Sequence, residues 1–224
     1  MEKIVLPRQD ENGEYYTSYS ALKTWEEKKG FNTGLLGRHE FILSYFFGEK
    51  WEDTKGFATF GTQVESFICG EKDAAKPFTD DEIKTLSKIT PLGVFQQEIK
   101  IPFDGFYVKG FIDDCSPDYT TIRDYKSASL NSSKKYYEDE YDQLDVYAMG
   151  IKHLTGKLPK NLEVVCIERL GNGFRGGRDV MTVGENIWVI PRKTSKERQQ
   201  QLKERIIRVT KEISDYHKVF LKLN

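Results

Sequence analysis

Two runs of strand-forming residues around an Asp-Gly pair constrain the fold of this chain more than any other feature. VFQQEIKIPF (94–103) and FYVKGFID (106–113) flank Asp104-Gly105. A two-residue Asp-Gly connection between such runs is a strong signal for a β-hairpin. TTIRDYKS (120–127) follows the turn-like SPDY and supplies a third strand. The centre of the chain is therefore expected to form an antiparallel meander.

The register of this meander places charged side chains on one face. Successive side chains of a strand alternate between faces, so Asp124 and Lys126 project to the same side. A two-residue turn centred on Pro117-Asp118 would place Asp113 opposite Ile122 and on that same face. We therefore expect the three charged residues to lie together.

Glu98 joins this face if the first hairpin has a two-residue turn. Such a turn at Asp104-Gly105 pairs Phe103 with Phe106 and Glu98 with Phe111. One extra residue in the loop would reverse the parity and move Glu98 to the opposite face.

Carboxylates gathered on one face repel each other unless a cation or a proton compensates their charge. Hard oxygen ligands favour Mg²⁺ or Mn²⁺, and Mg²⁺ typically uses one or two carboxylates with water and substrate phosphate. Such a metal polarises a phosphate and lowers the pKa of an attacking water. A lysine two residues after an acidic ligand can stabilise the developing negative charge. The pattern fits metal-dependent cleavage of nucleic acid; the alternative is a partly exposed hairpin with ordinary surface charges.

Hydrophobic spacing and caps outline the other elements. Helices and strands in this mixture predict an α/β fold with a central mixed β-sheet flanked by helices. A length of 224 residues and the lack of repeats favour one domain over 1–224. The last helix is expected to open with a capping box from Thr194 to Glu197. The predicted helices are 18–30, 38–51, 61–72, 136–156 and 194 to the C-terminus, and the further strands are 162–170 and 185–190.

Composition excludes several classes of protein. With 38% hydrophobic and 31% charged residues, the chain is neither disordered nor collagenous. It contains no apolar run of the ~18–20 residues that a membrane helix needs, and its start lacks a signal-peptide core. We expect no membrane partner and a cytoplasmic location. Eight basic residues between Arg192 and Lys211 predict either a positive end of the molecule or a solvated helix face.

Three motifs, in this order, resemble the PD-(D/E)xK nuclease superfamily, specifically its RecB-like and Cas4-like exonuclease branch, which includes small phage exonucleases. They are GFID (110–113), IRDYK (122–126) and QLDVYA (143–148), and SYSALKTW (18–25) is similar to the N-terminal helix of that branch. The resemblance covers residues 18–155. It implies a restriction-endonuclease-like core and hydrolysis of DNA phosphodiester bonds, with exonuclease action on DNA ends as the favoured form.

The same resemblance implies roles for individual residues. Gln143 and Tyr147 lie one helical turn apart and match a Q-x-x-x-Y motif that flanks the active site; the alternative is that they only cap and pack the helix. The implied metal ligands are the carboxylates of Asp113 and Asp124 and the backbone carbonyl of Tyr125, and the implied catalytic lysine is Lys126.

One position departs from the pattern of the branch. Many members carry a histidine in a G-x-x-x-H motif on the helix before the sheet, whereas Gly61-Thr62-Gln63-Val64-Glu65 ends in glutamate. Glutamate also ligates Mg²⁺, so Glu65 is expected as a third ligand, with an ordinary surface glutamate as the alternative.

The cysteines of the chain and the lack of a Walker A motif limit the cofactors and partners that we expect. Cas4-like members often hold an iron–sulfur cluster on four cysteines, which the three scattered cysteines Cys69, Cys115 and Cys166 cannot supply. We expect Mg²⁺ or Mn²⁺ and no iron–sulfur cluster. The expected partner is DNA. A helicase or recombination partner would be a separate chain, because a Walker A motif is missing, and a homo-oligomer that encircles DNA is compatible with processive digestion.

Other functions stay open at this point. An endonuclease would use the same site, because the sequence does not show whether the cleft is a closed tunnel or an open groove. A non-catalytic nucleic-acid-binding protein could retain the fold without turnover. Hydrolysis of another phosphate ester would share the same metal chemistry.

Overall fold

A mixed β-sheet organises the computed structural model, which describes residues 3–26, 35–50, 53, 55–129, 137 and 141–223. The strands are β1 (Tyr16–Ser18), β2 (Val94–Phe103), β3 (Phe106–Cys115), β4 (Thr121–Ala128), β5 (Asn161–Leu170) and β6 (Thr182–Arg192). These six pair in the order β1-β3-β4-β5-β6, with β2 also on β3. The β1–β3 and β4–β5 pairs are parallel and the others antiparallel. The predicted α/β class with a central mixed sheet is confirmed.

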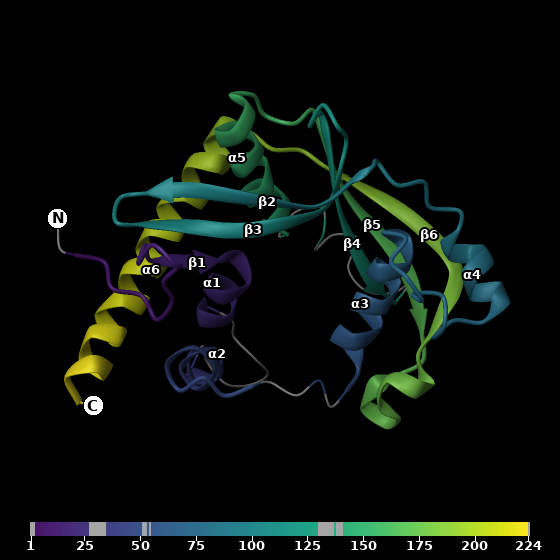
Figure 1. Ribbon diagram of the computed structural model, residues 1–224, viewed down its shortest axis with the longest axis horizontal. Coiled ribbons are helices and arrows are strands. Elements are labelled where there is room, and N and C mark those ends of the chain that lie inside the picture. The colour runs from purple at the N-terminus through teal and green to yellow at the C-terminus, as the bar shows by residue number, and fades with distance from the viewer. Residues whose placement is uncertain are drawn as a thin grey trace.

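Helices cover both faces of this sheet (Figure 1). Alternate residues of β5 sort into two hydrophobic clusters: Val164 and Cys166 face the side of α5, while Val165 and Ile167 face α3 and α4. In the described ranges, no helix combines the length and apolarity needed to cross a membrane. The helices are α1 (Tyr19–Glu26), α2 (Leu35–Phe41) continued by a π-helical turn (Ile42–Phe46), α3 (Phe57–Ile68), α4 (Asp80–Leu86), α5 (Gln143–Thr155) and α6 (Lys196–Leu223), with short 3-10 turns at Gly173–Arg175 and Gly177–Val180.

The first hairpin forms in the predicted register. Phe103 pairs with Phe106 and Glu98 pairs with Phe111. Gly105 adopts a φ of 81°, a left-handed conformation that glycine reaches without steric cost. The tight turn therefore sets the parity of every residue along β2 and β3.

The second turn is wider than predicted. Ile122 pairs with Cys115, so the expected pairing of Ile122 with Asp113 is wrong. The amide of Ser116 donates to the carbonyl of Thr121 at 3.0 Å, which leaves a four-residue loop. Asp118 holds that loop because its Oδ1 accepts a hydrogen bond from the Ser116 hydroxyl at 2.7 Å. A shift of two residues preserves parity, so the predicted shared face survives the wrong register.

One edge of β3 has a break in its pairing. β2 runs along the other edge, while this edge pairs with β1 at Tyr107 to Lys109 and with β4 at Asp114 and Cys115. Residues 110–113 lie between these two ladders. The sheet therefore opens beside Asp113.

Four predicted helix starts are wrong. α2 begins at Leu35 rather than at 38, and α5 begins at Gln143 rather than at 136. α3 begins at Phe57 rather than after Gly61, because Oδ2 of Asp53 accepts from the amide of Thr59 at 2.7 Å and supports an earlier start. α6 is capped by Ser195, whose hydroxyl oxygen accepts from the amide of Arg198 at 3.1 Å, one residue later than the predicted capping box. Parts of four predicted helices lie outside the described residues: 27–30, 51, 136 with 138–140, and 224.

Candidate active site

Asp113, Asp124 and Lys126 meet where β3 and β4 separate. Oδ2 of Asp113 accepts a hydrogen bond from the backbone amide of Tyr125 at 2.9 Å. Nζ of Lys126 lies 2.7 Å from Oδ2 of Asp124 and donates to the carbonyl of Tyr125 at 3.2 Å. Asp124 is fully buried and Asp113 is 8% exposed, while 30% of the Lys126 side chain reaches solvent. The cluster therefore has buried acids and an accessible cation.

Burial and mutual repulsion shape the charges of this cluster. Desolvation, followed by the charge of Asp124, raises the pKa of Asp113 to about 8. Desolvation opposes the charge of Lys126, but Asp124 and Asp113 outweigh it and raise the pKa of the ammonium above its usual range. Lys126 is therefore a fixed cation beside Asp124, and its charge acts against the raised pKa of Asp113.

Tyr141, just before α5, connects Asp124 to the Q-x-x-x-Y motif. Its Oη lies 2.9 Å from Oδ2 of Asp124 and 2.6 Å from Oε1 of Gln143. A hydroxyl has one proton, so Tyr141 donates to one of these two acceptors at a time. The amide of Gln143 in turn donates to the hydroxyl of Tyr147. Burial, and then the charge of Asp124, raises the pKa of Tyr141 well above its usual value. The structure thus brings Gln143 and Tyr147 to the cluster through a residue that sequence reasoning missed.

Glu65 approaches the cluster from α3, on the other side of the opened strands. Burial raises the pKa of Glu65, with Lys126 acting against the shift and Asp124 adding to it. Gln96 of β2 donates a side-chain hydrogen bond to Glu65. Gln96 also has a φ of 50°, an uncommon backbone conformation for a residue with a side chain. No sequence pattern singled out Gln96, because its role depends on this local departure from extended backbone.

Glu98 shares the predicted face but does not join the cluster. Its carboxylate lies 3.3 Å from Nζ of Lys109 and 3.9 Å from Nζ of Lys100. It pairs with Phe111, two residues along β3 from Asp113, a separation of about 7 Å. The expected ligand role of Glu98 therefore lacks geometric support: its neighbours along the strands are lysines.

The donor set suits a hard cation. Oδ1 of Asp124 is buried and has no hydrogen-bond partner among the residues that the structure describes. With the carboxylate of Asp113 and the carbonyl of Tyr125, it offers the oxygen chemistry that Mg²⁺ and Mn²⁺ prefer. Among the described residues, no three Asp, Glu, His or Cys side chains already form a ready metal-binding group. A metal here would rest on two carboxylates and a backbone carbonyl, with Glu65 nearby.

Two other buried acids are structural. Asp114 faces the other side of the sheet, where it accepts from the hydroxyl of Tyr125 at 2.7 Å and from the amide of Leu92 at 2.7 Å. Asp145, within the QLDVYA motif, lies 2.8 Å from Nε of Arg192, and both side chains are fully buried. Neither acid is directed at the cluster.

Comparisons with known proteins show a shared fold. No protein-family model and no curated protein matches the chain. A protein of known structure from Eubacterium rectale, assigned as an exonuclease, is similar at a TM-score of 0.55 and 18% identity, over 88% of this chain and 82% of that one. A phage-related exonuclease from Haemophilus somnus is similar at a TM-score of 0.54 and 14% identity, over 92% and 97% of the two chains. The mixed sheet with flanking helices is therefore a fold that exonuclease structures also adopt.

Proposed function

We propose that this chain is a metal-dependent nuclease that hydrolyses DNA phosphodiester bonds, acting on DNA ends as an exonuclease. One observation carries the proposal. Asp124 turns one oxygen to Lys126 and Tyr141, and its second, buried oxygen has no partner in the described ranges, at a break in the sheet beside Asp113. An unpaired buried carboxylate oxygen is costly unless a ligand compensates it.

The metal would be Mg²⁺ or Mn²⁺, held by the carboxylates of Asp113 and Asp124 and by the carbonyl of Tyr125, with Glu65 as a further ligand. When bound, such a metal polarises the scissile phosphate and lowers the pKa of an attacking water.

Lys126 would stabilise negative charge on the phosphate. Its raised pKa keeps the ammonium protonated, and its side chain is the partly exposed member of the cluster. A fixed cation at the position where charge develops lowers the barrier of a hydrolysis step. Lys126 would be a catalytic residue, and its contact with Asp124 keeps it in place before DNA binds.

Tyr141, Gln143 and Tyr147 would position Asp124. The hydroxyl of Tyr141 fixes Oδ2 of the carboxylate and leaves Oδ1 for a ligand. Gln143 holds Tyr141 from α5. These residues act through Asp124 and are positioning residues.

Exonuclease action and membership of the RecB-like branch rest on the GFID, IRDYK and QLDVYA motifs and on the names of the two structural neighbours. A role in DNA recombination or degradation is part of the proposal and rests on the resemblance to small phage exonucleases; one structural neighbour is named a phage-related exonuclease. DNA is the proposed partner, and any helicase or recombination protein would be a separate chain.

Cleavage of end-labelled linear DNA and covalently closed circular DNA tests this function. Each substrate is incubated with Mg²⁺, Mn²⁺ or EDTA, with wild type and Asp124→Asn. We expect metal-dependent loss of linear DNA alone, abolished in the variant. Cutting of the circle would replace the exonuclease with an endonuclease, and tight DNA binding without cleavage by wild type would reject the nuclease function.

A further inference from the structure

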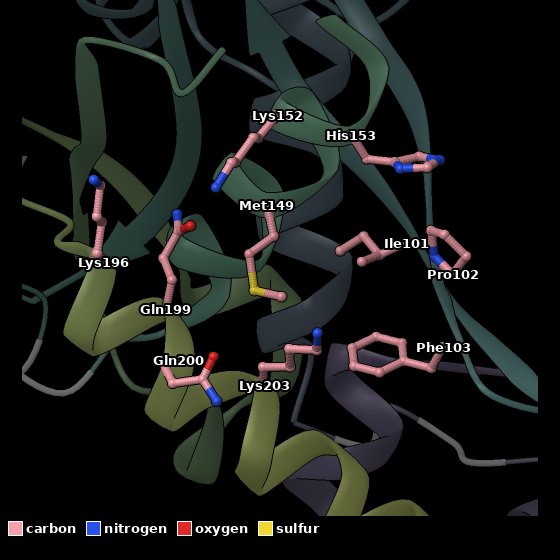
Figure 2. A pocket seen from close by; sticks show the side chains of 10 residues that line it. All are labelled: Ile101, Pro102, Phe103, Met149, Lys152, His153, Lys196, Gln199, Gln200 and Lys203. Atoms are coloured by element: carbon pink, nitrogen blue, oxygen red, sulfur yellow. The ribbon is translucent and has the colours of Figure 1, made fainter. Parts of the chain in front are cut away.

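A basic cavity of about 460 Å³ lies between β2, α5 and α6 (Figure 2), and no residue of the acidic cluster lines it. At about 100° per residue along α5, Met149 and Lys152 lie on the side of the helix opposite Gln143 and Tyr147. In Figure 2, Met149 lies among the lining side chains, between β2 on one side and α6 on the other. The lining residues are Ile101, Pro102, Phe103, Met149, Lys152, His153, Lys196, Gln199, Gln200 and Lys203.

The charge of this cavity is not compensated by the protein. Lys152, Lys196 and Lys203 line it together, and no acidic residue does. None of these three lysines forms an ion pair with a carboxylate in the part of the chain that the structure describes. By contrast, Arg205 and Arg208 of the same helix α6 are paired with Glu26. Free ammonium groups around a hollow surface attract an anion.

The start of α6 adds to this positive field. Lys196 is the first residue of α6, a helix of 28 residues. The first turn of a helix carries a partial positive charge, so it favours a negative ligand. Glu197, the acidic residue of this turn, does not line the cavity. The helix start and the lysines therefore select the same sign of charge.

Apolar side chains of β2 and amide side chains of α6 also line the cavity. Ile101 is buried, and the ring of Phe103 stacks on Phe106 at 4.9 Å with an interplanar angle of 8°. Gln199 is 8% exposed, and its amide nitrogen makes one long contact, 3.5 Å to Oγ1 of Thr194. A nearly buried amide with spare hydrogen-bonding capacity can bind the edge of a planar polar group.

We propose that this cavity is a nucleotide-binding site separate from the acidic cluster. The lysines bind the phosphate, and Ile101, Phe103 and Gln199 contact the base. The volume of the cavity falls in the range of small-ligand sites, about 300–1,000 Å³. The ligand class is a nucleotide phosphate, either a free mononucleotide or one residue of a DNA strand. The inference does not depend on cleavage at the acidic cluster.

Calorimetric titration in EDTA tests the site without turnover. The probes are dAMP, single-stranded (dA)6 and inorganic phosphate, added to wild type and to Lys152→Glu/Lys203→Glu. The double variant Lys72→Glu/Lys222→Glu is the control, because it makes the same charge change at exposed lysines outside the cavity. All four lysines are exposed, so we expect every variant to fold, which circular dichroism checks.

We expect dAMP or (dA)6 to bind wild type, the cavity variant to bind at least tenfold more weakly, and the control to change less than twofold. If (dA)6 binds much more tightly than dAMP, the ligand is a strand; equal affinities indicate a mononucleotide. Equal weakening in both double variants, or inorganic phosphate binding as tightly as dAMP, would overturn the proposal.

Photo-crosslinking with 8-azido-dAMP places the ligand by a second route. We expect labelled peptides that contain 149–153 or 196–203, and competition by unlabelled dAMP. Labelling confined to 113–126 would assign nucleotide binding to the acidic cluster and reject the separate site.

Discussion

The hydroxyl oxygen of Tyr141 lies 2.9 Å from Oδ2 of Asp124, the same carboxylate oxygen that Lys126 approaches at 2.7 Å. Both protein partners therefore use one oxygen, and the other, Oδ1, is buried without a partner. This division explains how one carboxylate can be held rigidly and still keep an oxygen for a ligand.

Tyr141→Phe should remove the fixed orientation of Asp124. A hydrogen bond to a charged group contributes about 1.5–3 kcal/mol, so we expect a loss of stability of that order. We also expect about a tenfold lower kcat for DNA cleavage with little change in KM, because Tyr141 acts through Asp124. Urea unfolding and steady-state kinetics measure both effects.

Tyr119→Phe is the matched control for Tyr141→Phe. The hydroxyl of Tyr119 donates to Oε1 of Gln97, a neutral acceptor, at 3.0 Å. We expect a smaller loss of stability, about 1 kcal/mol, and unchanged cleavage. Equal kinetics for the two variants would contradict the positioning role of Tyr141.

Glu65 and Glu98 should differ in their effect on metal dependence. The charges of Asp124 and Lys126 act on the pKa of Glu65, whereas Glu98 forms ion pairs with Lys109 and Lys100. We expect Glu65→Gln to raise the Mg²⁺ concentration for half-maximal cleavage about tenfold. Glu98→Gln should leave this value within about twofold of wild type, because it lies outside the cluster. If Glu98→Gln raised the Mg²⁺ requirement and Glu65→Gln did not, the metal would lie further along β2, near Glu98.

The stability of the metal-free protein should fall as pH rises. The pKa of Asp113 is about 8 in the folded protein against a usual 3.8. The folded state then binds the proton more tightly than the unfolded state, so ionisation costs stability between pH 4 and pH 8. In EDTA, we expect the melting temperature of wild type to drop over this range and that of Asp113→Asn to drop less. Parallel curves for the two proteins would contradict the raised pKa.

Asp145 should matter for folding rather than for chemistry. Its side chain and that of Arg192 are fully buried and 2.8 Å apart. Breaking such a pair costs about 3–5 kcal/mol. Arg192 keeps a second ion pair, with Asp142 at 3.1 Å, so we expect Asp145→Ala to lose about 3 kcal/mol in urea, the lower end of that range. The exposed pair of Lys211 and Asp215 at 2.8 Å is the comparison, and Asp215→Ala should cost less than about 1 kcal/mol. Similar losses would refute the distinction.

The hairpin shows how far local sequence determines structure. Asp104-Gly105 admits a two-residue turn, and that turn alone set the register of β2 on β3 correctly. The second turn was mispredicted because the hydrogen bonds of Asp118 hold a wider loop. Alternation along the strands still placed Asp113, Asp124 and Lys126 together, since a slip of two residues does not change the face.

The sequence did not predict the roles of Tyr141 and Gln96 in the candidate site, because these roles depend on packing between elements. Tyr141 fell within a predicted helix, yet it precedes α5 and reaches Asp124 across 17 positions of sequence. Gln96 reaches Glu65 from a different element. Glu98 was on the correct face, but its carboxylate forms an ion pair with Lys109 of β3. No periodicity in the sequence reports such contacts.

The central claim is that the cluster of Asp113, Asp124 and Lys126 cleaves DNA. Single-turnover cleavage of end-labelled linear DNA at saturating Mg²⁺, by wild type and Lys126→Ala, tests it most directly, with DNA binding measured in parallel. We predict a loss in rate of about 100-fold or more with DNA binding retained, because a charge-stabilising group is removed. Cleavage by Lys126→Ala at the wild-type rate would contradict the account.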